Sequence, residues 1–289
     1  MCRDTALVAV FVVFCFVFGS CSPNKASWDL HLTSNATERN ALCNDGTPGG
    51  FYVRQVDASS PRSKVWNIHL SGGFWCWDTA SCQSRWEIPL GQFYMSSNPY
   101  PKKLIYSGIF DASSANNPYF YNANSALGLY CSSDSWSGTS TAEENETGWN
   151  FFGHYNALAM VEDLWELYGL QDAELIVISG CSAGGMGQLA NVDRLRDWIH
   201  HRNPNIVVKG LVDAGWFLDF PLYPYHGNEN SFNAPVIPVR EQMQKGYSLW
   251  KGEPDANCVE FYHTEEEVWK CYLGQYGTKP CSKKSSDLL

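Results

Sequence analysis

The chain has 289 residues, of which 44% are apolar or aromatic and 17% are charged, a balance that indicates a globular protein with a large buried core. Its formal net charge of −10 argues against nucleic acid and anionic lipid as partners, because both bind basic surfaces. Aromatic residues reach 15% with 12 tryptophans, which suits either a cleft that faces carbohydrate or lipid or a tryptophan-rich core.

Residues 1–21 have the features of a secretory signal peptide. A short apolar run from Ala6 to Gly19 is followed directly by small residues. The run is shorter than the roughly 20 apolar residues that a transmembrane helix needs. We therefore expect cleavage near residues 19–22, a secreted protein and no membrane span in the mature chain, with an uncleaved anchor as the alternative.

Sequons and cysteines agree with export. The sequons at Asn35 and Asn145 predict two glycosylation sites. Eight of the 11 cysteines lie beyond residue 21, and no C-x-x-C pair occurs, which excludes zinc ribbons and thioredoxin-like sites. Cys76 and Cys82 are close enough to close one loop, and the other cysteines indicate longer-range disulfides formed in an oxidising compartment.

The chain alternates strand-like and helix-like segments. In order, we expect strands at 64–73, 102–110 and 126–133, a helix at 148–170, a strand at 173–179, a helix at 185–202 and a strand at 205–215. The run at 173–179 is continuously apolar, as in a parallel strand buried on both faces. This alternation predicts an α/β sheet with right-handed crossovers, and the sequence has no internal repeat or linker that would divide it into domains.

The segment Gly180-Cys181-Ser182-Ala183-Gly184 fits G-x-S-x-G between an expected strand and an expected helix. In that context the pattern is typical of a nucleophile elbow, in which a strained turn exposes the serine at the start of a helix. We therefore assign Ser182 as a candidate nucleophile. The alternative is a turn that only requires small residues.

Acyl transfer also needs hydrogen-bond donors for the oxyanion that forms on the substrate. A glycine pair, Gly72 and Gly73, ends the first expected strand, upstream of the elbow. Glycine-rich loops at this place complete the oxyanion hole of α/β hydrolases. We assign the donors to the backbone N–H groups of Gly73, Phe74 and Ala183, with an ordinary glycine turn as the alternative.

Several co-linear motifs resemble those of the pectin acetylesterase/Notum family of secreted carboxylesterases. The resemblance extends from about Leu42 to Cys281 and rests on LCNDGTPGGFYV, SGGFWC with SCQSRW, NPYFYNAN, YCSSDSWSG, SGCSAGGMG, NVDRLRDW and VDAGWFLD. It implies an α/β-hydrolase-like fold over residues 42–281, with a mostly parallel sheet flanked by helices, after an N-terminal extension at 22–41. It also implies an esterase that uses neither a metal nor an organic cofactor.

The resemblance further implies particular site residues. Cys43 would pair with Cys131 and Cys76 with Cys82. Separately from the resemblance, we expect Cys181 to stay free because of its place beside the nucleophile. Trp75, Trp216 and Phe217, next to Phe74, would line the acyl pocket, although each is equally typical of a core aromatic. The substrate would be an acylated protein, carrying a palmitoleoyl group, or an acetylated polysaccharide such as pectin.

The acid and the base of the catalytic triad have no clear candidates in this sequence. In the family both follow the region that matches KCYLGQYGTKPC, where this chain has a non-family tail at 282–289. We therefore expect the last strands of the sheet to be missing. Asp213, His226 and His263 are weak substitutes, and His154, His200 and His201 are typical of packing or surface positions. The alternative function is a catalytically inactive family member that acts as a binding protein or decoy.

Overall fold

We analysed a computed structural model of the chain, which describes residues 27–221, 237–262 and 264–277. The expected signal peptide, the tail at 282–289, His226, His263 and Cys281 lie outside these residues. Within them, no helix is both long enough and apolar enough to cross a bilayer.

One seven-stranded mixed sheet organises the fold, in the order β4-β1-β2-β5-β3-β6-β7. β5, β3, β6 and β7 run parallel, whereas β4, β1 and β2 pair antiparallel. The strands are β1 (Trp28–Leu32), β2 (Gly50–Arg54), β3 (Arg62–Leu70), β4 (Lys103–Leu104), β5 (Ala123–Gly128), β6 (Leu175–Cys181) and β7 (Val207–Asp213). The expected α/β class is thus confirmed, with the parallel half carrying the Ser182 segment.

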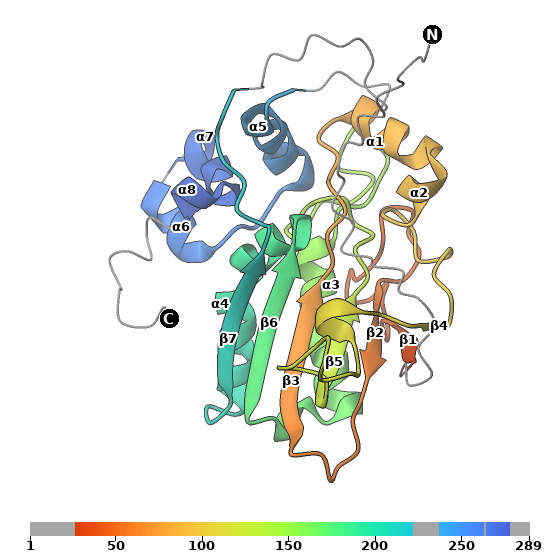
Figure 1. Cartoon of the computed structure of the whole chain (residues 1–289). Helices are drawn as coiled ribbons and strands as arrows, with labels where there is room; N and C mark the ends of the chain where they lie inside the picture. Colours follow the sequence, from red (N-terminus) through yellow and green to blue (C-terminus); the bar gives the residue numbers. More distant parts are fainter. Residues whose placement is uncertain (1–26, 222–236, 263, 278–289) are drawn as a thin grey trace, which may run out of the picture.

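Helices cover the sheet and gather beyond the carboxyl ends of its parallel strands (Figure 1). The α-helices are α1 (Thr79–Glu87), α2 (Pro89–Gln92), α3 (Gly153–Tyr168), α4 (Ala183–Arg202), α5 (Val239–Trp250), α6 (Ala256–Tyr262), α7 (Glu265–Val268) and α8 (Gly274–Gly277). Short 3-10 helices occupy Gly108–Phe110, Leu170–Asp172 and Trp269–Tyr272. α4 packs against β6 and β7, and α5 to α8 lie beyond the carboxyl ends of these two strands (Figure 1).

Alternating residues of the strands build a hydrophobic core on each face of the sheet. Phe51 and Ala126 belong to the larger cluster, which includes the apolar faces of α3 and α4. Tyr52 and Leu127, the next residues along the same two strands, belong to a smaller cluster with Trp28. β2 and β5 are therefore buried on both faces.

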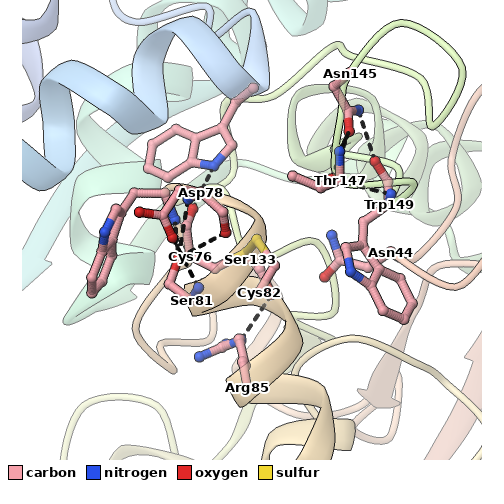
Figure 2. Close-up of a disulfide and its surroundings, with 12 residues drawn as sticks. Asn44, Cys76, Asp78, Ser81, Cys82, Arg85, Ser133, Asn145, Thr147 and Trp149 are labelled. Carbon is pink, nitrogen blue, oxygen red and sulfur yellow. Dashed lines mark hydrogen bonds between the residues drawn. A yellow bond between two sulfur atoms is a disulfide. The ribbon is translucent and has the colours of Figure 1, made fainter. Parts of the chain in front are cut away.

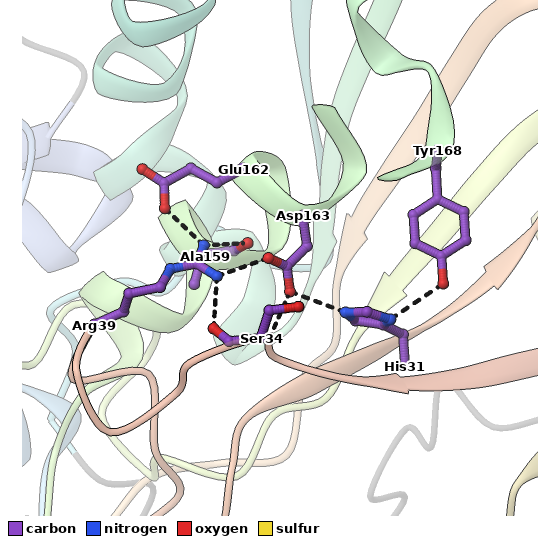
Figure 3. Close-up of polar contacts among 7 residues, drawn as sticks. All are labelled: His31, Ser34, Arg39, Ala159, Glu162, Asp163 and Tyr168. Atoms are coloured by element: carbon purple, nitrogen blue, oxygen red, sulfur yellow. Dashed lines mark hydrogen bonds and ion pairs between the residues drawn. The ribbon is translucent and has the colours of Figure 1, made fainter. Parts of the chain in front are cut away.

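Residues 22–41, expected as an extension before the domain, contribute β1 to the sheet. Arg39 anchors this segment to α3 through Asp163, 2.6 Å away, and through Glu162 at the same distance (Figure 3). His31 in β1 adds a 2.9 Å contact to Asp163 and lies 3.1 Å from the Tyr168 hydroxyl (Figure 3). The folded domain thus begins before residue 42.

Three disulfides join described residues. Cys43–Cys131 and Cys76–Cys82 are the two pairs that the family resemblance implies, and Cys258–Cys271 is a third. Cys181 is disulfide-bonded as well, so the expectation that it stays free is wrong. A thiol beside the candidate nucleophile is therefore absent from the folded chain described here.

Candidate active site

Ser182 lies at the sharp turn between β6 and α4. Its backbone has φ 57° and ψ −123°, a conformation that is sparsely populated by residues with a side chain. The turn is held from both sides, because the Ser182 N–H donates to the Asp213 carbonyl at 3.1 Å and the Ser182 carbonyl accepts from the Gly185 N–H at 2.9 Å. Ser182 is partly exposed, so this strained turn presents the residue toward solvent.

Close backbone contacts explain the glycines around Ser182. A Cβ atom added to Gly180 would lie 2.0 Å from the Gly184 carbonyl oxygen, and one added to Gly184 would lie 1.9 Å from the Leu70 carbonyl oxygen. Both positions therefore exclude any side chain. The G-x-S-x-G pattern is required here by the packing of β6, α4 and the end of β3.

The loop after β3 lies directly against the elbow. A Cβ atom on Gly72 would come within 2.4 Å of the Cys181 carbonyl oxygen and 2.9 Å of the Ser182 Cβ. The next two residues have positive φ angles, 157° at Gly73 and 58° at Phe74, and within the described chain neither of their N–H groups donates to another backbone group. Ala183 is the first residue of α4, where N–H groups have no partner inside the helix.

A buried carboxylate that the sequence analysis did not single out supports this loop. Asp134 accepts from the N–H groups of Gly138, at 3.1 Å, and Gly153, at 2.7 Å. Burial raises the pKa of its carboxyl to about 6, against the lowering effect of these hydrogen bonds. Asp134 also accepts from the Trp136 backbone N–H at 3.0 Å and so holds Trp136 in place. The Trp136 indole N–H in turn donates to the Ser71 carbonyl at 2.9 Å. The sequence signal for this residue is an aspartate in a serine-rich motif between a strand and a helix.

Two of the three expected acyl-pocket aromatics contact each other. Trp75 is buried and meets Phe217 edge to face, with ring centroids 5.2 Å apart, and its indole N–H donates to Gln242 Oε1 at 2.9 Å. Phe74, next to Trp75, is 48% exposed. Trp216 is half exposed and packs on Gly274, where an added Cβ would lie 2.4 Å from its ring. Trp75, Phe217 and Phe74 thus form one apolar group beside the glycine loop.

The described histidines are engaged away from Ser182. His69 lies 2.9 Å from the Ser179 hydroxyl, His31 contacts Asp163, and His200 contacts the Ile206 carbonyl at 2.9 Å. Burial lowers the pKa values of His69 and His154 to about 3, so both are neutral at pH 7. His201 is exposed in the last turn of α4, roughly 28 Å along the helix from Ser182. The Asp213 side chain is exposed, and its backbone carbonyl accepts from the Ser182 N–H.

The two sequons differ in their surroundings. Asn35 is exposed. The Asn145 amide nitrogen, by contrast, donates to the Trp149 carbonyl at 2.9 Å (Figure 2). It also donates to the Thr141 carbonyl at 2.5 Å and to the Ser140 hydroxyl at 3.1 Å. A glycan on this nitrogen would displace those contacts. Asn145 therefore serves here as a turn-forming residue.

Comparison with known proteins decides the family. The family model described as pectinacetylesterase matches residues 21–282. The chain belongs to the pectinacetylesterase family. The match covers β1 together with the elbow and the glycine loop, and it includes the segment from 22 to 41 that we expected to precede the domain.

The curated relatives of this pectinacetylesterase-family chain include palmitoleoyl-protein carboxylesterases. It is 36% identical to NOTUM from Drosophila melanogaster over 247 residues, which cover 83% of this chain and 34% of the relative. It is 35% identical to human NOTUM over 268 residues, 90% of this chain and 51% of the relative. The chain therefore spans about half the length of these relatives or less.

A solved structure supports the same assignment. The crystal structure of the Wnt deacylase Notum from Drosophila superposes with a TM-score of 0.74 at 35% sequence identity, covering 86% of this chain and 67% of that one. The α/β-hydrolase-like fold expected from the sequence is confirmed by this likeness.

Proposed function

We propose that this protein is a secreted serine carboxylic-ester hydrolase with Ser182 as nucleophile. The observation that carries the proposal is the strained, partly exposed Ser182 at the start of α4, with Gly72 packed against its Cβ. Family membership and the relatives' names support the reaction class. Disulfide bonds and the apolar run before residue 22 support secretion.

The proposed reaction has two steps. The Ser182 hydroxyl attacks the ester carbonyl, the alcohol leaves with a proton, and water then cleaves the acyl-enzyme to release the acid. The negative charge on the carbonyl oxygen in each step is received by the N–H groups of Gly73, Phe74 and Ala183. No cofactor enters this scheme.

The acyl group is proposed to be a long one carried by a protein. The named relatives are palmitoleoyl-protein carboxylesterases, and one solved relative is a Wnt deacylase. The apolar group of Phe74, Trp75 and Phe217 beside the glycine loop suits an acyl chain better than a polar sugar. An acetylated polysaccharide, which the family description suggests, is the other outcome of the test.

The test is hydrolysis of p-nitrophenyl esters from acetate to palmitate by the wild-type chain, by Ser182→Ala and by the exposed-site control Ser248→Ala. The proposal predicts that kcat/KM rises with acyl length and that only Ser182→Ala abolishes hydrolysis. A preference for acetate would assign the polysaccharide-type substrate. Undiminished hydrolysis by Ser182→Ala would contradict the assignment of the nucleophile.

The placement of the histidines in the described part of the chain favours a second candidate function, a protein that binds acyl groups without turnover. A serine esterase needs a base that accepts the serine proton, and His31, His69, His154, His200 and His201 are all engaged or placed elsewhere. Binding of palmitoleic acid without ester hydrolysis, lost on Phe217→Ala, would establish this function in place of the first.

A further inference from the structure

A buried arginine contacts the glycine loop from the interior side. Arg85 of α1 is 9% exposed, and its Nη2 donates to the Gly73 carbonyl at 2.5 Å. Its Nε donates to the Ser133 hydroxyl at 2.8 Å (Figure 2). That hydroxyl donates to the Tyr94 carbonyl at 3.0 Å. The guanidinium also lies over the Tyr94 ring, 4.8 Å from its centroid. Three contacts, to the Gly73 carbonyl, the Ser133 hydroxyl and the Tyr94 ring, thus fix a single orientation of this side chain.

The charge of Arg85 has no acidic partner among the ion pairs of the described chain. Burying an unpaired guanidinium is unfavourable, and an apolar residue of similar volume is often neutral or stabilising at such a position. Burial lowers the pKa of Arg85, but an arginine side chain stays protonated in proteins. Stability alone therefore does not explain an arginine here.

α1, which carries Arg85, is itself anchored beside the loop. Asp78 caps its first turn by accepting from the Ser81 N–H at 2.8 Å, and the Cys76–Cys82 disulfide joins the helix to the loop (Figure 2). The Cys76 N–H also donates to the Ser133 carbonyl at 3.0 Å. The guanidinium therefore approaches Gly73 from a rigid support.

The Gly73 carbonyl and the Phe74 N–H belong to the same peptide group. Every peptide bond in the described chain is trans, so these two groups point in opposite directions. The carbonyl points inward to Arg85, and the N–H consequently points away from the interior. On that side Phe74 is half exposed and Gly72 packs against Ser182.

We propose that Arg85 is a positioning residue of the oxyanion hole: its guanidinium holds and polarises the Gly73–Phe74 peptide so that the Phe74 N–H donates to the oxyanion formed at Ser182. A charged donor on the carbonyl strengthens the N–H of the same peptide as a donor, because hydrogen bonds in a chain polarise one another. The inference rests on the proposed esterase function and adds a residue that does not touch the substrate.

The kinetic test compares an oxygen ester with its thiono analogue, p-nitrophenyl butyrate and p-nitrophenyl thionobutyrate, in the full chain. Sulfur accepts hydrogen bonds weakly, so the thiono ester gains little from oxyanion donors. Arg85→Met should lower kcat for the oxygen ester about 10- to 100-fold with little change in KM, because the loss of one oxyanion donor costs about 10²- to 10³-fold. Hydrolysis of the thiono ester should change less than about twofold.

The matched control is Arg54→Met. Arg54 is also buried, and it also donates to backbone carbonyls, those of Phe120, Tyr121 and Ala123, far from the elbow. Arg54→Met should leave the ratio of oxygen-ester to thiono-ester hydrolysis unchanged. Equal losses for both esters in Arg85→Met would reduce Arg85 to a structural role and overturn the proposal, as would no loss for either.

A second measurement does not depend on turnover. With 15N-labelled phenylalanine, the Phe74 amide should shift and exchange faster in Arg85→Met, while the other phenylalanine amides stay nearly unchanged. An unmoved Phe74 signal would overturn the proposal. If Arg85→Met does not fold, Ser133→Ala, which removes the acceptor of Nε, must show the same shift at smaller amplitude. If Ser182→Ala hydrolyses the esters as fast as the wild-type chain, the proposed function is refuted. The Phe74 signal would still decide the role of Arg85.

Discussion

Single residues carry the chemistry of this site through backbone conformation. Ser182 is held at a positive φ by hydrogen bonds at its own N–H and carbonyl, so its position does not depend on the side chain. Gly73 and Phe74 likewise contribute main-chain groups, and Arg85 acts on one of them. Substitution of side chains that line the acyl group should therefore change which ester is cleaved more than the rate of the acyl transfer itself.

Phe217→Ala tests the acyl pocket. Removing the ring that packs against Trp75 should lower kcat/KM for p-nitrophenyl decanoate about 10-fold relative to the acetate, since apolar pocket contacts are worth about 1–3 kcal/mol. Phe220→Ala, in the same segment and 66% exposed, is the control. An unchanged ratio of decanoate to acetate would remove Phe217 from the pocket.

The sequons give a second test at this scale. Asn35→Gln should remove the mass that an N-linked glycan adds to the secreted chain, whereas Asn145→Gln should leave that added mass unchanged. Asn145→Gln should also lower the free energy of unfolding by about 1–3 kcal/mol, because three hydrogen bonds of its amide nitrogen are lost. Intact-mass spectrometry and urea unfolding measure the two effects. A glycan found on Asn145 would show that the loop folds differently in the cell.

At the scale of elements, the site depends on how closely β3, β6 and α4 approach one another. Gly72→Ala tests this contact, because its Cβ would overlap the Cys181 carbonyl and press on the Ser182 Cβ. We expect loss of ester hydrolysis by at least about 100-fold. The control is Gly148→Ala, because no atom lies within 4 Å of a Cβ added to Gly148. Only the strain of a side chain at φ 73° should act there, and it should lower the free energy of unfolding by about 1 kcal/mol. Full activity of Gly72→Ala would contradict the placement of the loop.

The sequence predicts those elements whose signal is local. β6, Ser182 and α4 follow from a continuous apolar run, a glycine-flanked serine and a helical pattern, and each is found within a few residues of its expected bounds. β1 was missed although its residues WDLHL alternate apolar and polar, because the run is only five residues long and its place in the sheet depends on pairing with β2 and β4. The expected strand at 102–110 pairs over only two residues, since Gly108–Phe110 turns into a 3-10 helix.

The support of the glycine loop was invisible in the sequence for a different reason. Trp136 and Ser71 are 65 residues apart, and Arg85 reaches Gly73 only after the Cys76–Cys82 turn brings α1 back. No spacing rule connects such pairs. The family motifs contained these residues, but they did not state which of them contact the loop.

At the scale of the whole molecule, one edge of the described sheet, at β7, has an exposed apolar face. β7 is the last of the described strands in the sheet order, and its residues alternate between two faces. Gly210 faces Gln188 and Val192 of α4, whereas Val207 and Leu211 on the opposite face are 48% and 45% exposed. An apolar edge strand of this kind favours association with other chains.

Leu211→Lys tests this property. The wild-type chain should associate with rising concentration, and the lysine should shift it toward monomer in sedimentation velocity experiments. Leu167→Lys, a change of a leucine on α3 that is 57% exposed, should leave association unchanged. A wild-type chain that is monomeric at all concentrations would contradict the prediction.

The most direct test of the account is covalent labelling of the nucleophile. The wild-type chain is treated with a fluorophosphonate, digested and mapped by mass spectrometry, with Ser182→Ala as the control. The account predicts one adduct, on the peptide that contains Ser182, and none in Ser182→Ala. An adduct on another serine, or no adduct under conditions that label other serine esterases, would contradict the assignment of Ser182 as the nucleophile.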